Sequence, residues 1–301
     1  MTDPNWPRAS AWLGGDNLEE TIATLQVIGA PVRLGSISGG RFDLAPQEIR
    51  AALERFSTYD GEVDVRAVRV RDSGDLALAS KTPEESLDEI SGAVGGSLPH
   101  SDALVILGGD NSITRPGVRG LGPDLKRIGL LTLDAHHDLR DTADGLSNGN
   151  PVRALLEDGL PGSNIAQIGI QAFANSPAYA EVAKDQGIKV CSVELARARG
   201  VAGSVEEALE ELDAHVDAIY VDLDVDVLDR AFAPACPGSR PGGLTPWEVQ
   251  AAARICGEFP KVRAIDIVEV DPKRDVKEVT TLAAASFVLS FAAGLTRRGA
   301  S

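Results

Sequence analysis

Short apolar runs alternate with longer amphipathic stretches along most of the chain, and this alternation constrains the fold more than any other feature. The runs are often rich in Val, Ile and Leu, as strands buried on both faces are. Eight of them occur, at residues 24–29, 64–70, 103–107, 128–133, 165–170, 188–193, 217–223 and 262–268. Strands that alternate with helices pair in parallel, so we predict an α/β fold with helices on both sides of a parallel sheet. A closed (β/α)8 barrel is the alternative that the pattern leaves open.

Helical patterns fill the intervals between these runs. The segments TPEE at 82–85 and TPWE at 245–248 each place a capping threonine, a proline and early acid at a helix start. We predict helices over residues 46–56, 82–94, 204–212, 245–256 and 276–295. Residues 1–22 show no clear periodicity, and we expect an arm that packs on the domain or on a neighbouring subunit. No repeat or Gly/Ser linker divides the rest, so we predict one domain over residues 23–301.

The composition argues against several classes of partner. The chain carries 45 acidic and 29 basic side chains, a net charge of −16 that repels phosphate backbones, so we expect no nucleic-acid partner. No apolar stretch reaches ~18 residues and the start does not resemble a signal peptide, so we expect no membrane partner. Cys191, Cys236 and Cys256 form no close-spaced pair, which disfavours a disulfide framework or a zinc knuckle. These features together predict a cytoplasmic protein.

Polar residues follow four of the apolar runs, at the position where a parallel sheet binds its ligands. The run at 104–107 leads to GGDNS, 128–133 to DAHHDLRD, 218–221 to DLDVDVLD, and 262–267 to VEVDP. Each of these ends carries carboxylates, and one also carries histidines. We therefore expect the chemistry of the protein to lie at these four strand ends.

The spacing of these side chains predicts a metal site. Asp134, His136 and Asp138 alternate along extended chain and point to one side, as do Asp224 and Asp226 at another strand end. Converging carboxylates would be driven towards protonation unless a cation accompanied them. Carboxylate and imidazole together suit Mn²⁺, and this many ligands suggests two ions ~3.5–4 Å apart.

The other histidines are expected to be structural. His137 points away from the shared focus by the same alternation. His100 and His215 lie before strands, at the opposite edge of the sheet from the expected site.

Four stretches resemble the signatures of the ureohydrolase family, and they occur in the family's order: GGDNS, LDAHHD, DLDVDVLDRAFAPACPGSRPGGLT and DIVEVDP. The family includes arginases, agmatinases, guanidinobutyrases and formimidoylglutamases, and the resemblance covers about residues 25–295. It implies an arginase-like three-layer α/β/α sandwich with an eight-stranded, mostly parallel sheet, two Mn²⁺ ions per subunit, and homo-trimers or hexamers. By position, the family's metal ligands match Asp134, His136, Asp138, Asp224 and Asp226.

Asn111 stands where most members of this family have a metal-binding histidine. An amide oxygen can still be a ligand, but it is a weaker donor than an imidazole. We therefore expect one manganese ion to be held loosely, with Asn111 as its ligand or as the anchor of a bound water.

Further residues point to the substrate. The loop at 146–153 lacks the histidine that agmatinases and arginases carry there, whereas Arg140, the Asn148-Gly pair and FANS at 173–176 resemble formimidoylglutamases. The resemblance thus implies hydrolysis of N-formimidoyl-L-glutamate to glutamate and formamide. We expect Arg140, Asn148 and Arg153 to bind this substrate, and an arginine can hold a carboxylate in bidentate fashion. The alternative for Arg140 is a salt bridge to a neighbouring aspartate.

The expected mechanism uses water activated by the metal ions. Asp138 would hold the nucleophile and pass a proton to the leaving nitrogen, and Glu269 would pair with the cationic amidinium and orient it. Asp222 replaces the small hydroxyl residue usual in relatives, and the sequence gives it no clear role.

Three alternatives stay open at this point. A ureohydrolase could act on agmatine, guanidinobutyrate or arginine and release urea. A binding protein could use the same fold without turnover, for which Asn111 is the only support. A nucleotide-binding α/β protein is disfavoured because no glycine-rich phosphate loop occurs in the right context.

Overall fold

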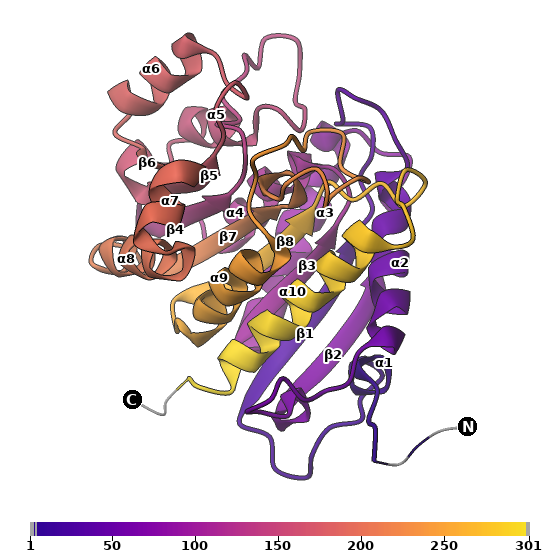
Figure 1. The fold of residues 1–301 in the computed structure, drawn as a ribbon. Coiled ribbons are helices and arrows are strands. Elements are labelled where there is room, and N and C mark those ends of the chain that lie inside the picture. The colour runs from indigo at the N-terminus through magenta and orange to yellow at the C-terminus, as the bar shows by residue number, and fades with distance from the viewer. Residues whose placement is uncertain (1–2, 4, 299–301) are drawn as a thin grey trace.

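The computed structural model describes residue 3 and residues 5–298, and within them eight strands form one sheet (Figure 1). The strand order is β2-β1-β3-β8-β7-β4-β5-β6, and every neighbouring pair is parallel. The strands are β1 (Ala23–Ala30), β2 (Val68–Asp75), β3 (Ala103–Gly108), β4 (Ile128–Leu133), β5 (Ile165–Ile170), β6 (Lys189–Ser192), β7 (Ala218–Asp224) and β8 (Val262–Val268). The sheet is open, with β2 and β6 at its edges, so the closed barrel is wrong.

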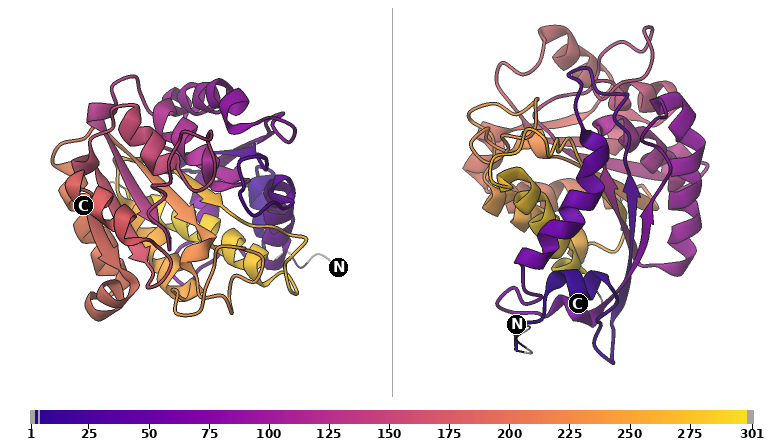
Figure 2. Two further views of the ribbon diagram at one scale, coloured as in Figure 1. Left: turned by 90° about the horizontal axis from the view of Figure 1, so that it is seen from above. Right: turned by 90° about the vertical axis from the view of Figure 1, so that its right-hand side faces the viewer.

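Helices cover both faces of the sheet and complete a three-layer α/β/α sandwich (Figure 2). One face carries α1 (Ala9–Leu13), α2 (Ala45–Ala52), α7 (Val193–Arg199), α8 (Val201–Asp213), α9 (Pro246–Glu258) and α10 (Val279–Leu295). The other carries α3 (Pro83–Ser97), α4 (Thr114–Gly120), α5 (Pro151–Glu157) and α6 (Pro177–Asp185). Each face therefore has its own apolar core. No described helix has the length and apolarity needed to cross a membrane.

The strands that the sequence predicts best are those buried on both faces. All residues of β3, β4 and β5 are buried, so their apolar character is continuous and easily recognised. In the edge strand β2, buried and exposed residues alternate only over the first few positions, and the rest of the strand is exposed. The strand begins later than the predicted range, 64–70, because Asp64 caps a 3-10 turn over Val65–Ala67 and β2 follows this turn.

Helix ends also differ from the predictions where local caps decide them. Lys277 and Glu278 have left-handed φ angles, and Asp275 accepts hydrogen bonds from the backbone of Thr280 and Thr281. The last helix, α10, therefore begins at Val279 rather than at residue 276. Five short helices were not predicted, namely α1, α4, α5, α6 and α7.

The N-terminal segment packs on the domain. Trp12, in α1, is fully buried, and its Nε1 donates a hydrogen bond to the carbonyl of Val68 at 2.9 Å. Residues 1, 2 and 4 of the expected arm, and residues 299–301 of the expected domain, lie outside the described residues.

The four strands whose ends carry the polar motifs are neighbours in the centre of the sheet. They occur in the order β3-β8-β7-β4, and their parallel pairing brings all four carboxyl ends to one edge. The topology thus places four sequence-distant motifs beside one another.

Candidate metal centre

The ends of β4 and β7 bring an imidazole and carboxylates together. His136 Nδ1 lies 2.6 Å from Asp226 Oδ2 and 3.6 Å from Asp134 Oδ1. Backbone N–H groups hold both carboxylates in place, since Ala135 donates to Asp226 Oδ1 at 2.9 Å and His136 donates to Asp134 Oδ1 at 2.6 Å. The ligand atoms of the three side chains lie within 4.8 Å of one another, which is close enough for one cation to contact them all.

A second group of possible ligands overlaps the first at Asp226. Asp224, Asp226 and Cys236 also offer ligand atoms within 4.8 Å of one another. The 3-10 turn over Val225–Val227 fixes the two carboxylates, because Asp224 Oδ1 accepts the Asp226 N–H at 2.8 Å. Cys236 was not predicted as a site residue, since no other cysteine or histidine lies near it in the sequence. Burial raises the pKa of its thiol well above the usual range, so it is protonated.

Asn111 joins the group from the end of β3. Its Nδ2 donates to Asp138 Oδ2 at 2.7 Å, and its Oδ1 lies 2.7 Å from Thr114 Oγ1. Its backbone N–H donates to Glu269 Oε1 at 2.9 Å. The structure therefore brings Asp138 and Glu269 each into contact with Asn111.

Asp138 and Glu269 have left-handed backbone conformations, with φ of 53° and 68°. Such a conformation costs a side-chain-bearing residue about 1–3 kcal/mol, and strain of this kind clusters at functional sites. Glu269 is held there because its N–H donates to the carbonyl of Gly109 and its Oε1 also accepts Asn148 Nδ2 at 3.0 Å.

The buried charges of this site are unbalanced without a cation. Burial and the charge of Asp226 raise the pKa of Asp134 to about 7, and burial and the charge of Asp110 raise the pKa of Glu269 to about 8. Burial lowers the pKa of His136, but the charges of Asp226 and Asp134 outweigh it and raise that pKa to about 11. A bound cation inverts this balance. Carboxylate oxygens with one imidazole are a donor set that suits Mn²⁺.

A cavity of about 220 Å³ opens above these carboxylates. Asp138, Asp224, Asp226 and Glu269 form its acidic floor, and Arg140, Asn148 and Arg240 stand on its wall. The predicted residue Arg153 does not line this cavity, because its Nε pairs with Glu157 Oε1 at 2.9 Å. Arg240 was not predicted.

Histidines other than His136 lie away from the cavity. His137 is buried, and its Nδ1 lies 2.7 Å from Gln167 Oε1. His100 and His215 are exposed and lie just before β3 and β7, at the opposite edge of the sheet.

Asp222 lies beneath the site and is fully buried. Neither of its oxygens has a hydrogen-bond partner within the described part of the chain. Burial and the charge of Asp266, its register partner on β8, raise the pKa of Asp222 well above the usual range.

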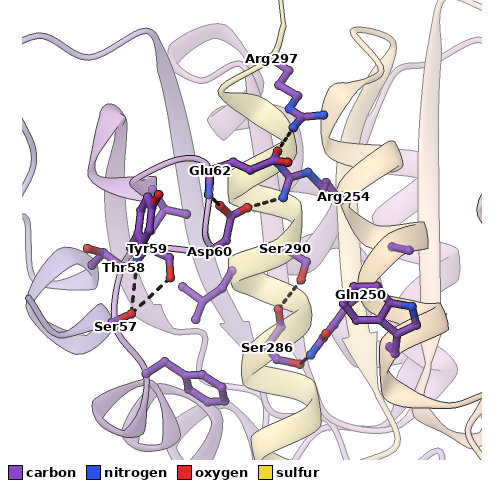
Figure 3. Close-up of a pocket in the computed structure, with 15 residues that line it drawn as sticks. Ser57, Thr58, Tyr59, Asp60, Glu62, Gln250, Arg254, Ser286, Ser290 and Arg297 are labelled. Carbon is purple, nitrogen blue, oxygen red and sulfur yellow. Dashed lines mark hydrogen bonds and ion pairs between the residues drawn. The ribbon is translucent and has the colours of Figure 1, made fainter.

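A larger cavity, about 580 Å³, lies between residues 56–65, α9 and α10 (Figure 3). Its charged side chains are paired with one another, Asp60 and Glu62 with Arg254, and Glu62 also with Arg297. No histidine or cysteine lines it among the described residues. It therefore lacks the donor set of the carboxylate site.

Known proteins are similar to this chain over most of its length. The formimidoylglutamase of Halalkalibacterium halodurans is 38% identical over 89% of this chain and 86% of its own. The solved formimidoylglutamase of Bacillus subtilis has a TM-score of 0.90 at 32% identity, covering 99% of this chain and 95% of its own.

A third neighbour is the Trypanosoma cruzi formiminoglutamase solved with Mn²⁺, which has a TM-score of 0.87 at 23% identity. It covers 97% of this chain and 99% of its own, and it shares the fold. The profile described as "Arginase family" matches residues 23–294. Together with the acidic centre at the sheet edge, these matches show that the chain belongs to the arginase family, metal-dependent hydrolases of C–N bonds in linear amidines.

Proposed function

We propose that this protein is a manganese-dependent formimidoylglutamase, which hydrolyses N-formimidoyl-L-glutamate to L-glutamate and formamide. The observation that carries the proposal is the polarity of the cavity, acidic at its floor and with arginines on its wall. The substrate has the opposite polarity, with a cationic amidine at one end and two carboxylates at the other. Agmatine, which is cationic at both ends, does not match that wall.

The proposed ligands of two Mn²⁺ ions are Asn111, Asp134, His136, Asp138, Asp224 and Asp226. In the proposal the ion near Asn111 is held loosely, since the Nδ2 of this residue is already bonded to Asp138. The pair of ions supplies Lewis-acid activation of a water molecule.

Asp138 and Glu269 are the proposed catalytic residues. The Asp138 carboxylate would accept a proton from the attacking water and deliver it to the leaving nitrogen of glutamate. Glu269 would hold the amidinium over the reacting water, and such orientation lowers the barrier by several kcal/mol. Its Oε1 is fixed by the Asn111 N–H and by Asn148, so the carboxylate is positioned before substrate arrives.

A product assay with added Mn²⁺ tests the proposed reaction. We expect formamide from N-formimidoyl-L-glutamate at a rate far above the urea released from agmatine, 4-guanidinobutyrate or arginine. Urea as the main product would replace this proposal with another ureohydrolase activity. Turnover that Asp138→Ala abolishes would exclude the binding-protein alternative.

We also propose that the protein is a cytoplasmic homo-oligomer, a trimer or a hexamer. Tyr59 and Trp247 support an assembled state, because both are large, exposed and beside the cavity of Figure 3. The three cysteines are buried and free, which suits a reducing compartment. Sedimentation velocity of the manganese-loaded protein tests the assembly, and a monomer at micromolar concentration would contradict it.

A further inference from the structure

Arg240 makes a contact with His136 that metal binding excludes. Arg240 Nη1 lies 2.7 Å from His136 Nε2, on the side of the ring opposite to Asp226. A guanidinium only donates hydrogen bonds, so Nε2 can accept this contact only while it carries no proton. Nδ1 is the atom that faces the carboxylates.

An imidazole that gives its Nδ1 lone pair to a cation keeps its proton on Nε2. Nε2 and Arg240 Nη1 are then both donors, and their contact becomes repulsive. The guanidinium must then move away from His136, and the same Nη1 also donates to the carbonyl of Gly238 at 2.7 Å. Arg240 lines the cavity, so its displaced donors remain beside the substrate.

Arg140 is a second arginine on the same wall. Neither Arg140 nor Arg240 forms an ion pair with any described residue, although acids outnumber bases in this chain by 45 to 29. Arg140 lies against Gly149, where an added Cβ would come within 2.6 Å of its Cδ. The glycine therefore makes room for the aliphatic part of Arg140 at the rim of the cavity.

We propose that Arg240 binds the α-carboxylate of the substrate once metal has displaced it from His136, and that Arg140 binds the distal carboxylate. This inference rests on the proposed function and names the residues that select a dicarboxylate. Arg240 takes the nearer carboxylate because it touches a residue of the metal centre, whereas Arg140 is exposed at the rim. A guanidinium can donate two parallel hydrogen bonds to one carboxylate and so bind it in bidentate fashion.

The test compares Arg240→Met, Arg240→Lys and Arg140→Met with the wild type. We expect Arg240→Met to raise KM for N-formimidoyl-L-glutamate about 10- to 100-fold, with a much smaller change in kcat. This increase in KM should nearly vanish for N-formimidoyl-4-aminobutanoate, which lacks the α-carboxylate. Arg140→Met should instead weaken the binding of both substrates. The KM of Arg240→Lys should lie between those of the wild type and Arg240→Met, because lysine keeps the positive charge but cannot form a bidentate pair with a carboxylate.

A binding measurement separates this inference from the reaction. L-Glutamate is titrated calorimetrically into the manganese-loaded proteins, with Arg199→Met as the control, since Arg199 pairs with Glu207 on the exposed surface. We expect Arg240→Met to lower the affinity for glutamate at least 10-fold while the metal content stays at the wild-type value. Unchanged KM and glutamate affinity in Arg240→Met would overturn the assignment even if formamide is produced. Glutamate binding that needs Arg240 in a protein without formamide production would keep the assignment and end the proposed function.

Discussion

The two sides of the candidate metal centre differ in how their polar groups are paired. On the imidazole side, at the ends of β4 and β7, the ligand atoms of Asp134, His136 and Asp226 converge within 4.8 Å. On the amide side, at the end of β3, Asn111 and Asp138 already bind each other at 2.7 Å. A cation on the imidazole side replaces the contact of His136 with Asp226 and gains an imidazole and two carboxylates, whereas one on the amide side replaces the Asn111–Asp138 hydrogen bond and gains the weaker amide donor. We infer that two adjacent sites in one centre can differ in affinity.

Removing a ligand of the imidazole side should have the largest effect. We expect His136→Ala to lower kcat/KM by about 10³-fold or more, because it removes several kcal/mol of Lewis-acid stabilisation. Metal analysis after gel filtration should show loss of bound Mn²⁺. Asp217→Asn is the control, since Asp217 is exposed at the opposite end of β7 and pairs with Arg127. Full activity in His136→Ala would contradict the proposed role of His136 as a metal ligand on the imidazole side.

Glu269→Gln separates substrate orientation from metal binding. We expect kcat to fall about 10²- to 10³-fold, because an amide no longer stabilises the cationic amidinium. Metal content should stay at the wild-type value. Glu278→Gln is a matched control, since Glu278 also has a left-handed backbone but is exposed. Loss of Mn²⁺ from Glu269→Gln would show that Glu269 belongs to the metal shell instead.

We expect Thr114 to influence which end of the Asn111 amide faces Asp138, because its hydroxyl contacts that amide. Thr114 Oγ1 lies 2.7 Å from Asn111 Oδ1 and 2.9 Å from Asp266 Oδ2, and it can donate to only one of them. When it donates to Asp266, Asn111 must turn its Nδ2 to Thr114 and its oxygen to Asp138, where a cation can use it.

Thr114→Val should therefore weaken the ion on the amide side about 10- to 100-fold, the usual effect of losing a group that orients a ligand. Thr114→Ser retains the hydroxyl and serves as the control. Calorimetric titration with Mn²⁺ measures both variants. Equal affinities in the two variants would show that the hydroxyl does not orient Asn111.

The metal-free protein should lose stability as pH rises from about 5 to 8. The folded-state pKa values of Asp134 and Glu269, about 7 and about 8, lie above their ordinary values, so the folded state holds protons that the unfolded state has released. Their contribution is full below about pH 4 and is lost as pH rises through about 7 and 8. We expect Tm to fall by a few degrees per pH unit, and saturating Mn²⁺ to remove this slope. A metal-free Tm that rises over this range would contradict the charge imbalance.

Most of the fold could be predicted from the sequence because the central strands share the same continuous apolar pattern. β3, β4 and β5 are apolar at nearly every position, and their burial on both faces makes them recognisable. α4 was missed because Pro116 and Gly117 break its helical pattern, and the helix is fixed by packing, with Gly117 directly against Tyr220. Tertiary contacts thus decide the elements whose own sequence is ambiguous.

The site residues divide in the same way. Alternation predicted that Asp134, His136 and Asp138 point to one side, whereas β4 ends at Leu133, Asp134 and His136 approach Asp226, and Asp138 contacts Asn111. Arg240 and Cys236 were not predicted, because a long loop brings them to the centre and no spacing in the sequence records that approach. Arg153 was expected at the substrate, but it pairs with Glu157 and does not line the cavity.

Titration of the metal-free protein with Mn²⁺, followed by the EPR signal of the free ion, tests the unequal centre most directly. We predict two ions per chain with dissociation constants at least about 10-fold apart, and convergence of the two in Asn111→His, because an imidazole replaces the weaker amide ligand. One class of two equal sites in the wild type, or no change in Asn111→His, would contradict the account.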